Sequence, residues 1–184
     1  MSGRRTLVTT LAVVAVTVTL DQISKTWAES ALGDGDTIEL LPTLEFDLAY
    51  NSGFSFSTGT GFGRYIGILV VGLIGFLGWQ IATSESMGRV WILATIMGGA
   101  IGNLLDRLLR AENGFLSGEV IDFIDVTWYA VFNVADIFVV CGALTFAGFE
   151  LVTHHRAEQE AEADPDMTAA ITADRTDGAE TSNR

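Results

Sequence analysis

Carboxylates and amides occur inside or beside the apolar runs of this sequence, where ionisable side chains are rare. Asp21 and Lys25 are four residues apart, and Asn133 and Asp136 are three apart. Residues at these spacings share one face of a helix, so each pair is placed to act together. An ionisable group inside a membrane span costs at least roughly 2.5–3.5 kcal/mol, so each of these residues indicates a partner or a function.

A third group stands near the end of another apolar run, where Asn103, Asp106 and Arg107 follow at helical spacing. Asp106 has Arg107 beside it, and Asp21 has Lys25 one helical turn away. Buried acids with a nearby cation are more often architecture than catalysis. We therefore predict that these two acid and base pairs form a structural frame.

Asp122 and Asp136 differ because no cation follows either of them at helical spacing. Asp122 lies in the extended-looking segment 120–126, where successive side chains alternate, so Asp122 and Asp125 point to opposite faces and only one can face the cluster. Two close carboxylates cannot both ionise, and such a pair is typical of general acid–base chemistry. The residues thus predict a catalytic pair of Asp122 and Asp136.

Four apolar runs must position these groups. Of the 184 residues, 49% are hydrophobic, and the mean hydropathy is +0.39, which is high for a soluble domain. Each run is close to the ~20 residues that a helix needs to cross a bilayer. We predict an all-α membrane protein in which residues 1–153 form one four-helix domain, with spans at about 6–28, 65–83, 90–109 and 131–153.

Arginines place the two termini on one side of the membrane. The N-terminal pair, Arg89 and Arg156 would all be cytoplasmic under the positive-inside rule. Asp21, Asp106 and Asp136 then converge at the extracytoplasmic leaflet. The N-terminus also resembles a cleaved signal peptide, but the first run continues past Asp21 without a helix breaker, which favours a retained span.

The first outer loop predicts a small amphipathic β-sheet over residues 37–58, lying against the bilayer surface. Residues 44–50 alternate apolar and polar, the pattern of a half-buried strand, and Asn51 to Gly53 then turn the chain. Two groups of glycines are expected to let helices pack closely. They are Gly72, Gly75 and Gly78, and Gly98, Gly99 and Gly102.

The last segment, residues 154–184, holds eight acidic residues and three arginines with few apolar ones. This composition predicts a disordered cytoplasmic tail. The tail accounts for part of the net charge of −13, so the charge does not indicate a basic partner. The single cysteine, Cys141, lies in the fourth run and is expected only to pack.

With its motifs in this order, the chain resembles the lipoprotein signal peptidases, or signal peptidase II, of bacterial cytoplasmic membranes. The resemblance covers residues from about 15 to 150. It rests on Asp21-Gln-Ile-Ser-Lys25, Asn51-Ser-Gly53, Gly98-Gly-Ala-Ile-Gly-Asn-Leu-Leu-Asp-Arg107, Val120-Ile-Asp-Phe123 and Phe132-Asn-Val-Ala-Asp136.

The resemblance implies an aspartic endopeptidase whose catalytic residues are Asp122 and Asp136. It implies a membrane-anchored prolipoprotein substrate bearing a diacylglyceryl group, cut just before the lipid-modified cysteine, and contact with membrane lipid. No cofactor, metal or nucleic acid is expected, and the oligomeric state stays open. Substrate positioning or site architecture is implied for Asp21, Lys25, Asn51, Gly53, Asn103, Asp106, Arg107 and Asn133.

Other functions remain as alternatives. Acids in spans also occur in ion or proton transporters, although the acids here lie near one leaflet and no internal repeat is visible. A serine–lysine peptidase would pair Lys25 with Ser52, Ser55 or Ser57, which requires a neutral lysine. A metalloprotease is disfavoured because both histidines, His154 and His155, lie far from the cluster, and an inert scaffold leaves so many buried charges unexplained.

Overall fold

The computed structural model describes residues 2–53, 63–111 and 114–163. In these residues four helices are long and apolar enough to cross a membrane, and three strands form a small sheet, which confirms the predicted fold class. The helices are α1 (Gly3–Leu32), α2 (Gly63–Ala82), α3 (Met87–Leu109) and α4 (Val134–Ala163). The strands are β1 (Ile38–Leu41), β2 (Leu44–Asn51) and β3 (Val120–Val126).

Helix α1 packs against α3 along a stripe of buried residues spaced three or four apart. A Cβ atom added at Gly98 would lie 2.7 Å from the Cβ of Thr17, and one at Gly102 would lie 2.5 Å from Oδ2 of Asp21. Only glycine therefore allows this close approach. Gly99 likewise allows α3 to approach α4 closely, because an added Cβ would lie 2.6 Å from the carbonyl oxygen of Ala135.

The other glycine group behaves differently. Among the described residues, nothing lies within 4 Å of a Cβ added at Gly72, Gly75 or Gly78. The prediction that these three glycines pack inside the bundle is therefore wrong, whereas that for Gly98, Gly99 and Gly102 is confirmed. Glycine spacing alone cannot tell which face of a helix meets a neighbour, because the neighbour is chosen by the tertiary arrangement.

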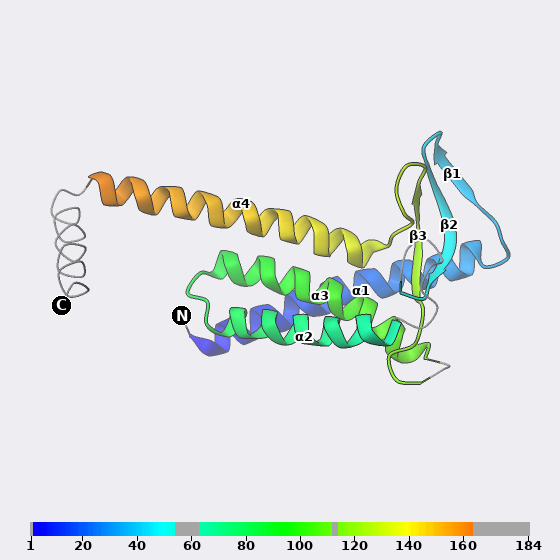
Figure 1. Cartoon of the computed structure of the whole chain (residues 1–184), viewed down its shortest axis with the longest axis horizontal. Coiled ribbons are helices and arrows are strands. Elements are labelled where there is room, and N and C mark those ends of the chain that lie inside the picture. The colour runs from blue at the N-terminus through cyan, green and yellow to red at the C-terminus, as the bar shows by residue number, and fades with distance from the viewer. Residues whose placement is uncertain (1, 54–62, 112–113, 164–184) are drawn as a thin grey trace, which may run out of the picture. The chain divides into compact units, whose positions relative to one another are not determined.

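Strands β1, β2 and β3 form an antiparallel sheet in that order at one end of α1 (Figure 1). The strand predicted at residues 44–50 is confirmed as β2. Its partner β3 comes from the second outer loop, with Ala49 opposite Asp122 and Asn51 opposite Val120. The sheet is therefore not confined to residues 37–58 as predicted. Phe54 and Phe56 of that range lie outside the described residues.

A small apolar core joins the sheet to the end of α1. Ile121 and Phe123 of β3 are buried together with Ala28 and Leu32 of α1. The ring of Trp27 also meets Phe123 edge to face, with centroids 6.1 Å apart. Since side chains alternate along a strand, this anchoring turns Asp122 to the other face of β3.

Residues 1–145 form one compact unit, and residues from 146 onward belong to a second. Within the second unit α4 continues to Ala163. Residues 154–163, which the composition predicts to be disordered, are therefore helical. Their alanine, glutamate and glutamine residues have high helix propensity, so a helix forms there without an apolar run. The rest of the tail lies outside the described residues.

Candidate active site

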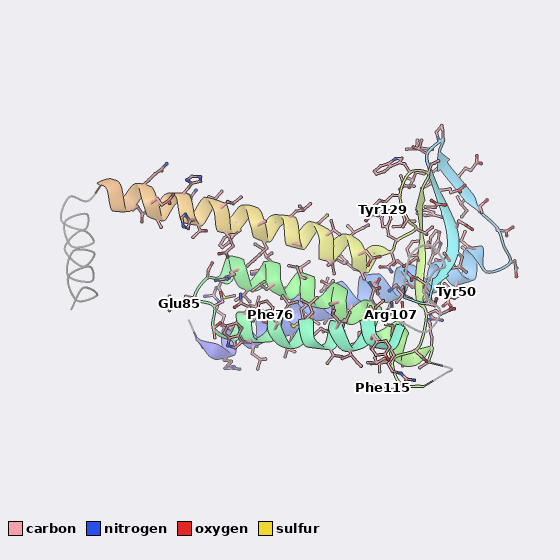
Figure 2. All side chains as sticks on the ribbon, in the orientation of Figure 1. Tyr50, Phe76, Glu85, Arg107, Phe115 and Tyr129 are labelled. Atoms are coloured by element: carbon pink, nitrogen blue, oxygen red, sulfur yellow. The ribbon has the colours of Figure 1, made fainter. Side chains whose placement is uncertain are left out.

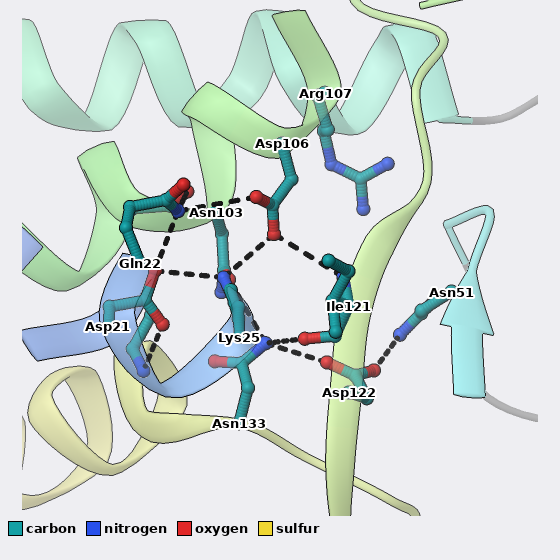
Figure 3. A network of polar contacts seen from close by, with 12 residues as sticks. Asp21, Gln22, Lys25, Asn51, Asn103, Asp106, Arg107, Ile121, Asp122 and Asn133 are labelled. Atoms are coloured by element: carbon teal, nitrogen blue, oxygen red, sulfur yellow. Dashed lines mark hydrogen bonds and ion pairs between the residues drawn. The ribbon is translucent and has the colours of Figure 1, made fainter. Parts of the chain in front are cut away.

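Lys25, Asp21 and Asp106 form a buried ion-pair cluster between α1 and α3 (Figure 3). The Nζ atom of Lys25 lies 2.9 Å from Oδ2 of Asp21 and 2.8 Å from Oδ2 of Asp106, and all three side chains are at most 1% exposed. Nζ also donates to Oδ1 of Asn103 at 2.9 Å. The three ammonium protons thus have three acceptors, and the predicted Asp21–Lys25 pair is confirmed.

Arg107 does not take the role predicted for it. Among the described residues its guanidinium donates from Nη1 to the carbonyl oxygen of Gly118 at 3.4 Å. The cations that contact Asp106 are Lys25 at 2.8 Å and, more distantly, Nε of Arg110 at 3.9 Å. Consecutive residues of a helix point in different directions, so Arg107 cannot readily face its neighbour. Arg107 instead holds the segment that leads into β3.

Asp122 is 3% exposed and accepts a hydrogen bond on each carboxylate oxygen. Asn133 donates to Oδ1 at 2.6 Å, and Asn51 donates to Oδ2 at 2.9 Å. Burial raises the pKa of Asp122 to about 6, with the nearby charge of Asp136 acting in the same direction, while the amide donors oppose the rise. Asp122 therefore keeps its proton to much higher pH than an exposed aspartate.

Asp136 stands in the first turn of α4, where Asn133 precedes the helix. The N–H of Asp136 donates to Oδ1 of Asn133 at 3.0 Å, and the N–H of Asn133 donates to Oδ2 of Asp136 at 3.3 Å. This reciprocal arrangement is a capping box. Asn103 of α3 donates from Nδ2 to Oδ1 of Asp136 at 2.8 Å. Both carboxylate oxygens of Asp136 therefore accept a hydrogen bond at the N-terminus of α4.

Asn51 and Gly53 form the turn that ends β2. Oδ1 of Asn51 accepts the N–H of Gly53 at 3.0 Å, which fixes the amide so that Nδ2 faces Asp122. Gly53 has a φ of +139°, a conformation that other residues rarely adopt. The glycine thus shapes the turn, and the asparagine makes the contact.

Asp125 points away from this group, as the strand alternation predicts. It is half-buried and lies directly across from Glu45 of β2, whereas Asp122 is buried and bonded to Asn133.

Asp122 and Asp136 line one pocket of about 570 Å³, together with Asn51. Most of the remaining wall is apolar or aromatic and comes from the segment after β3 and from the first turns of α4. These residues are Val126, Trp128, Tyr129, Ala130, Val131, Phe132, Ile137, Val139, Val140 and Cys141. The pocket thus combines two acids with a surface suited to apolar groups.

The pocket and the frame lie at one end of the bundle. Tyr129, Tyr50 and Arg107 stand at that end, whereas Glu85 in the connection between α2 and α3 stands at the other (Figure 2). The convergence of acids at one leaflet, inferred from alternating topology, agrees with this arrangement.

Sequence reasoning missed several contributors. Gln22 donates from Nε2 to Oδ2 of Asp21 at 3.1 Å and to Oδ1 of Asp106 at 3.2 Å. Its position beside Asp21 gave no signal, because adjacent helical residues do not share a face. Cys141, which was expected only to pack, lines the pocket, and so do Val126 and the residues from Trp128 to Phe132.

Within the described residues, no group of three or more histidine, cysteine, aspartate or glutamate side chains is arranged to hold a metal ion.

Two solved bacterial membrane enzyme structures share this fold. One, determined by the in meso method at 2.3 Å resolution, has a TM-score of 0.65 and 23% sequence identity, covering 79% of this chain and 88% of that one. The other, at 1.9 Å resolution, also has a TM-score of 0.65 and 23% identity, covering 78% and 92%. At this identity the similarity supports the fold.

Sequence relatives carry the comparison further. A lipoprotein signal peptidase of Mycobacterium leprae is 36% identical over 82% of this chain and 77% of its own length. One from Mycobacterium tuberculosis is 38% identical over 78% of this chain and 73% of its own. The sequence profile of signal peptidase (SPase) II matches residues 13–152, which include every residue of the site described above. The chain therefore belongs to the signal peptidase II family.

Proposed function

We propose that this chain is a lipoprotein signal peptidase, an aspartic endopeptidase in which Asp122 and Asp136 are the catalytic residues. The observation that carries the proposal is that two carboxylates from different elements, β3 and α4, line one pocket and are held by neutral amides. Amides orient a carboxylate without neutralising it, so both acids stay available for proton transfer.

The surroundings of the two acids support different roles for them. Asp122 keeps its proton to higher pH than an exposed aspartate, because burial raises its pKa to about 6, and we assign it the role of the acid. Asp136 accepts hydrogen bonds from the N–H of Asn133 and from the amide of Asn103, and we assign it the role of the base. Asp136 then takes a proton from the attacking water, and Asp122 donates a hydrogen bond to the scissile carbonyl. Proton transfer of this kind contributes about 10²–10⁴-fold in rate.

The pocket wall supports a lipid-bearing substrate. Beyond the two acids it is mainly apolar, and Trp128 and Tyr129 bring aromatic surface to it. Such a wall fits an acyl chain or an apolar signal-peptide segment better than a polar peptide. We propose that the substrate is a membrane-anchored prolipoprotein with a diacylglyceryl-modified cysteine, and that the bond cut lies just before this cysteine.

The proposed location is the bacterial cytoplasmic membrane, with both termini cytoplasmic and the pocket at the extracytoplasmic leaflet. The four long apolar helices and the cytoplasmic assignment of Arg89 and Arg156 support it. Residues 1–153 would then be the peptidase domain, and Asp122, on a strand outside the spans, would meet water.

The alternatives fit the site less well. A serine–lysine mechanism needs a lysine that is available as a base, but the Nζ atom of Lys25 is already engaged by two carboxylates. Ser55 and Ser57 lie outside the described residues. A transporter would be revealed by ion flux in liposomes without any peptide.

Cleavage by purified protein tests the proposal. We expect a diacylglyceryl-modified precursor to be cut and the unmodified one to be left intact, with or without a chelator. Asp122→Asn and Asp136→Asn should each abolish cleavage while the protein still inserts into membranes. Asp125→Asn is the matched control on the opposite face of β3 and should retain activity. Full activity of Asp122→Asn or Asp136→Asn would contradict the assignment of these two residues as catalytic.

A further inference from the structure

Two backbone N–H groups, each from the residue just before a proposed catalytic aspartate, donate to buried carboxylates. The N–H of Ala135 donates to Oδ1 of Asp21 at 3.0 Å. The N–H of Ile121 donates to Oδ2 of Asp106 at 3.3 Å. Asp21 therefore fixes the backbone beside the aspartate on α4, and Asp106 fixes the backbone beside the aspartate on β3.

Lys25 joins these two attachments. Its Nζ atom contacts Oδ2 of Asp21 at 2.9 Å and Oδ2 of Asp106 at 2.8 Å. Gln22 reinforces the link by donating to both carboxylates. A continuous set of buried contacts therefore runs from the start of α4, through α1 and α3, to β3 (Figure 3).

We propose that Asp21, Lys25 and Asp106, together called the Lys25 clamp, are positioning residues that set the separation of Asp122 and Asp136. The inference rests on the proposed function of the two aspartates. It assigns the three members of the clamp to catalytic geometry, where the family resemblance implied either substrate positioning or site architecture.

The clamp has no access to substrate. Its three side chains are at most 1% exposed, and none of them is among the described residues that line the pocket. A change in the clamp therefore acts without touching substrate: through the backbone of β3 and α4, through the side chain of Asn103, and through the charge of Lys25, which lowers the pKa of Asp122. A misplacement of 1 Å in a catalytic group can cost about 10²-fold in rate, so a small change in separation is enough to be measured.

Lys25 also orients a direct contact of Asp136. Its third proton goes to Oδ1 of Asn103, at 2.9 Å, so the Nδ2 end of the same amide turns to Asp136, at 2.8 Å. The ammonium group thus has one acceptor for each proton. A planar guanidinium could not reproduce this tetrahedral arrangement, so arginine is no substitute at position 25.

The first test uses Asp21→Asn and Asp106→Asn, each of which removes one charged contact to Lys25. Cleavage kinetics with the lipid-modified precursor should show kcat reduced about 10²-fold with KM unchanged, because the clamp does not touch substrate. Asp125→Asn is the control. Asp125 is half-buried on β3 and points away from Asp122 and the clamp, so this variant should stay within about twofold of the parent protein.

A second test separates positioning from stability. The triple variant Asp21→Asn/Lys25→Met/Asp106→Asn removes all three charges of the clamp together, so neither a buried lysine without its carboxylates nor a buried carboxylate without its lysine remains. We expect thermal unfolding near that of the parent protein but a kcat as low as in the single variants. Removal of the Lys25 charge also raises the pKa of Asp122 and shifts the pH profile, so kcat is compared at the pH optimum of each variant.

The outcomes are distinguishable. If Asp122→Asn and Asp136→Asn keep activity, the proposed function fails. If those two variants are inactive while folded Asp21→Asn or the triple variant has the kcat of the parent protein, only the clamp fails. The clamp proposal would likewise be overturned if the loss of activity disappeared after correction for the folded fraction. If the triple variant does not fold, Asp21→Asn alone provides this comparison.

Discussion

Asn133 and Asp136 hold each other reciprocally at the start of α4, each backbone N–H donating to the side chain of the other. The same asparagine donates from Nδ2 to Asp122 at 2.6 Å. One residue therefore caps the helix that carries one proposed catalytic aspartate and contacts the other directly. This double role links the stability of the helix start to the geometry of the site.

Replacing Asn133 should separate the two roles. Serine is a good N-cap but has no amide, whereas alanine neither caps nor donates. We expect Asn133→Ser to unfold near the parent temperature, and Asn133→Ala to be less stable by about 1 kcal/mol. Both variants should lose most cleavage activity, because both lack the donor to Asp122. Equal stability of the two variants in thermal unfolding would contradict the capping role.

The raised pKa of Asp122 predicts a pH-dependent stability. With a folded pKa of about 6 against the ordinary value of 3.8, the folded protein binds this proton more tightly than the unfolded chain. The stabilisation is fully present below 3.8 and is lost as pH rises through about 6. Ionisation of Asp122 should therefore lower the free energy of unfolding by about 3 kcal/mol at neutral pH.

Asp122→Asn removes that titration. The difference in unfolding temperature between this variant and the parent protein should therefore become more favourable to the variant between pH 4.5 and 7.5. Comparing the two proteins at each pH cancels the other titrating groups. A difference that stays constant over this range would contradict the raised pKa.

Asn51 should also affect the pKa of Asp122. Its amide donates to the carboxylate of Asp122, and this bond lowers the pKa of Asp122 against the effect of burial. Asn51→Ala removes the bond, so the pKa should rise. Because Asp122 acts protonated, the limb of the kcat/KM profile that falls with increasing pH should move to higher pH. Ser52→Ala should leave both the profile and the rate unchanged, and a large loss there would instead favour a serine nucleophile.

Two glycine positions should respond oppositely to alanine. An alanine Cβ at Gly99 would meet the carbonyl oxygen of Ala135 at 2.6 Å, so α3 and α4 would have to move apart. At Gly75 nothing among the described residues lies within 4 Å. Alanine is favoured over glycine in a helix by about 1 kcal/mol, so Gly75→Ala should be neutral or stabilising and Gly99→Ala destabilising. Thermal unfolding and cleavage rates measure both effects.

Local patterns in the sequence determined most of the secondary structure and one ion pair. Four apolar runs indicated four helices, the period-2 pattern of residues 44–50 indicated β2, and the alternation along 120–126 placed Asp122 and Asp125 on opposite faces. The spacing of Asp21 and Lys25 indicated their ion pair. These features follow from the fixed periods of helix and strand, so they need no knowledge of neighbouring elements.

Only the tertiary structure decided what meets across elements. Lys25 takes Asp106 of α3 as a second partner, Arg107 turns to Gly118, and β3 pairs with β2. The absence of a side chain at Gly102 brings α1 close enough for the first of these contacts. The sequence by itself determined which residues could carry the chemistry, and packing between helices and strands decided which of them touch, because such contacts depend on distances that no local period fixes.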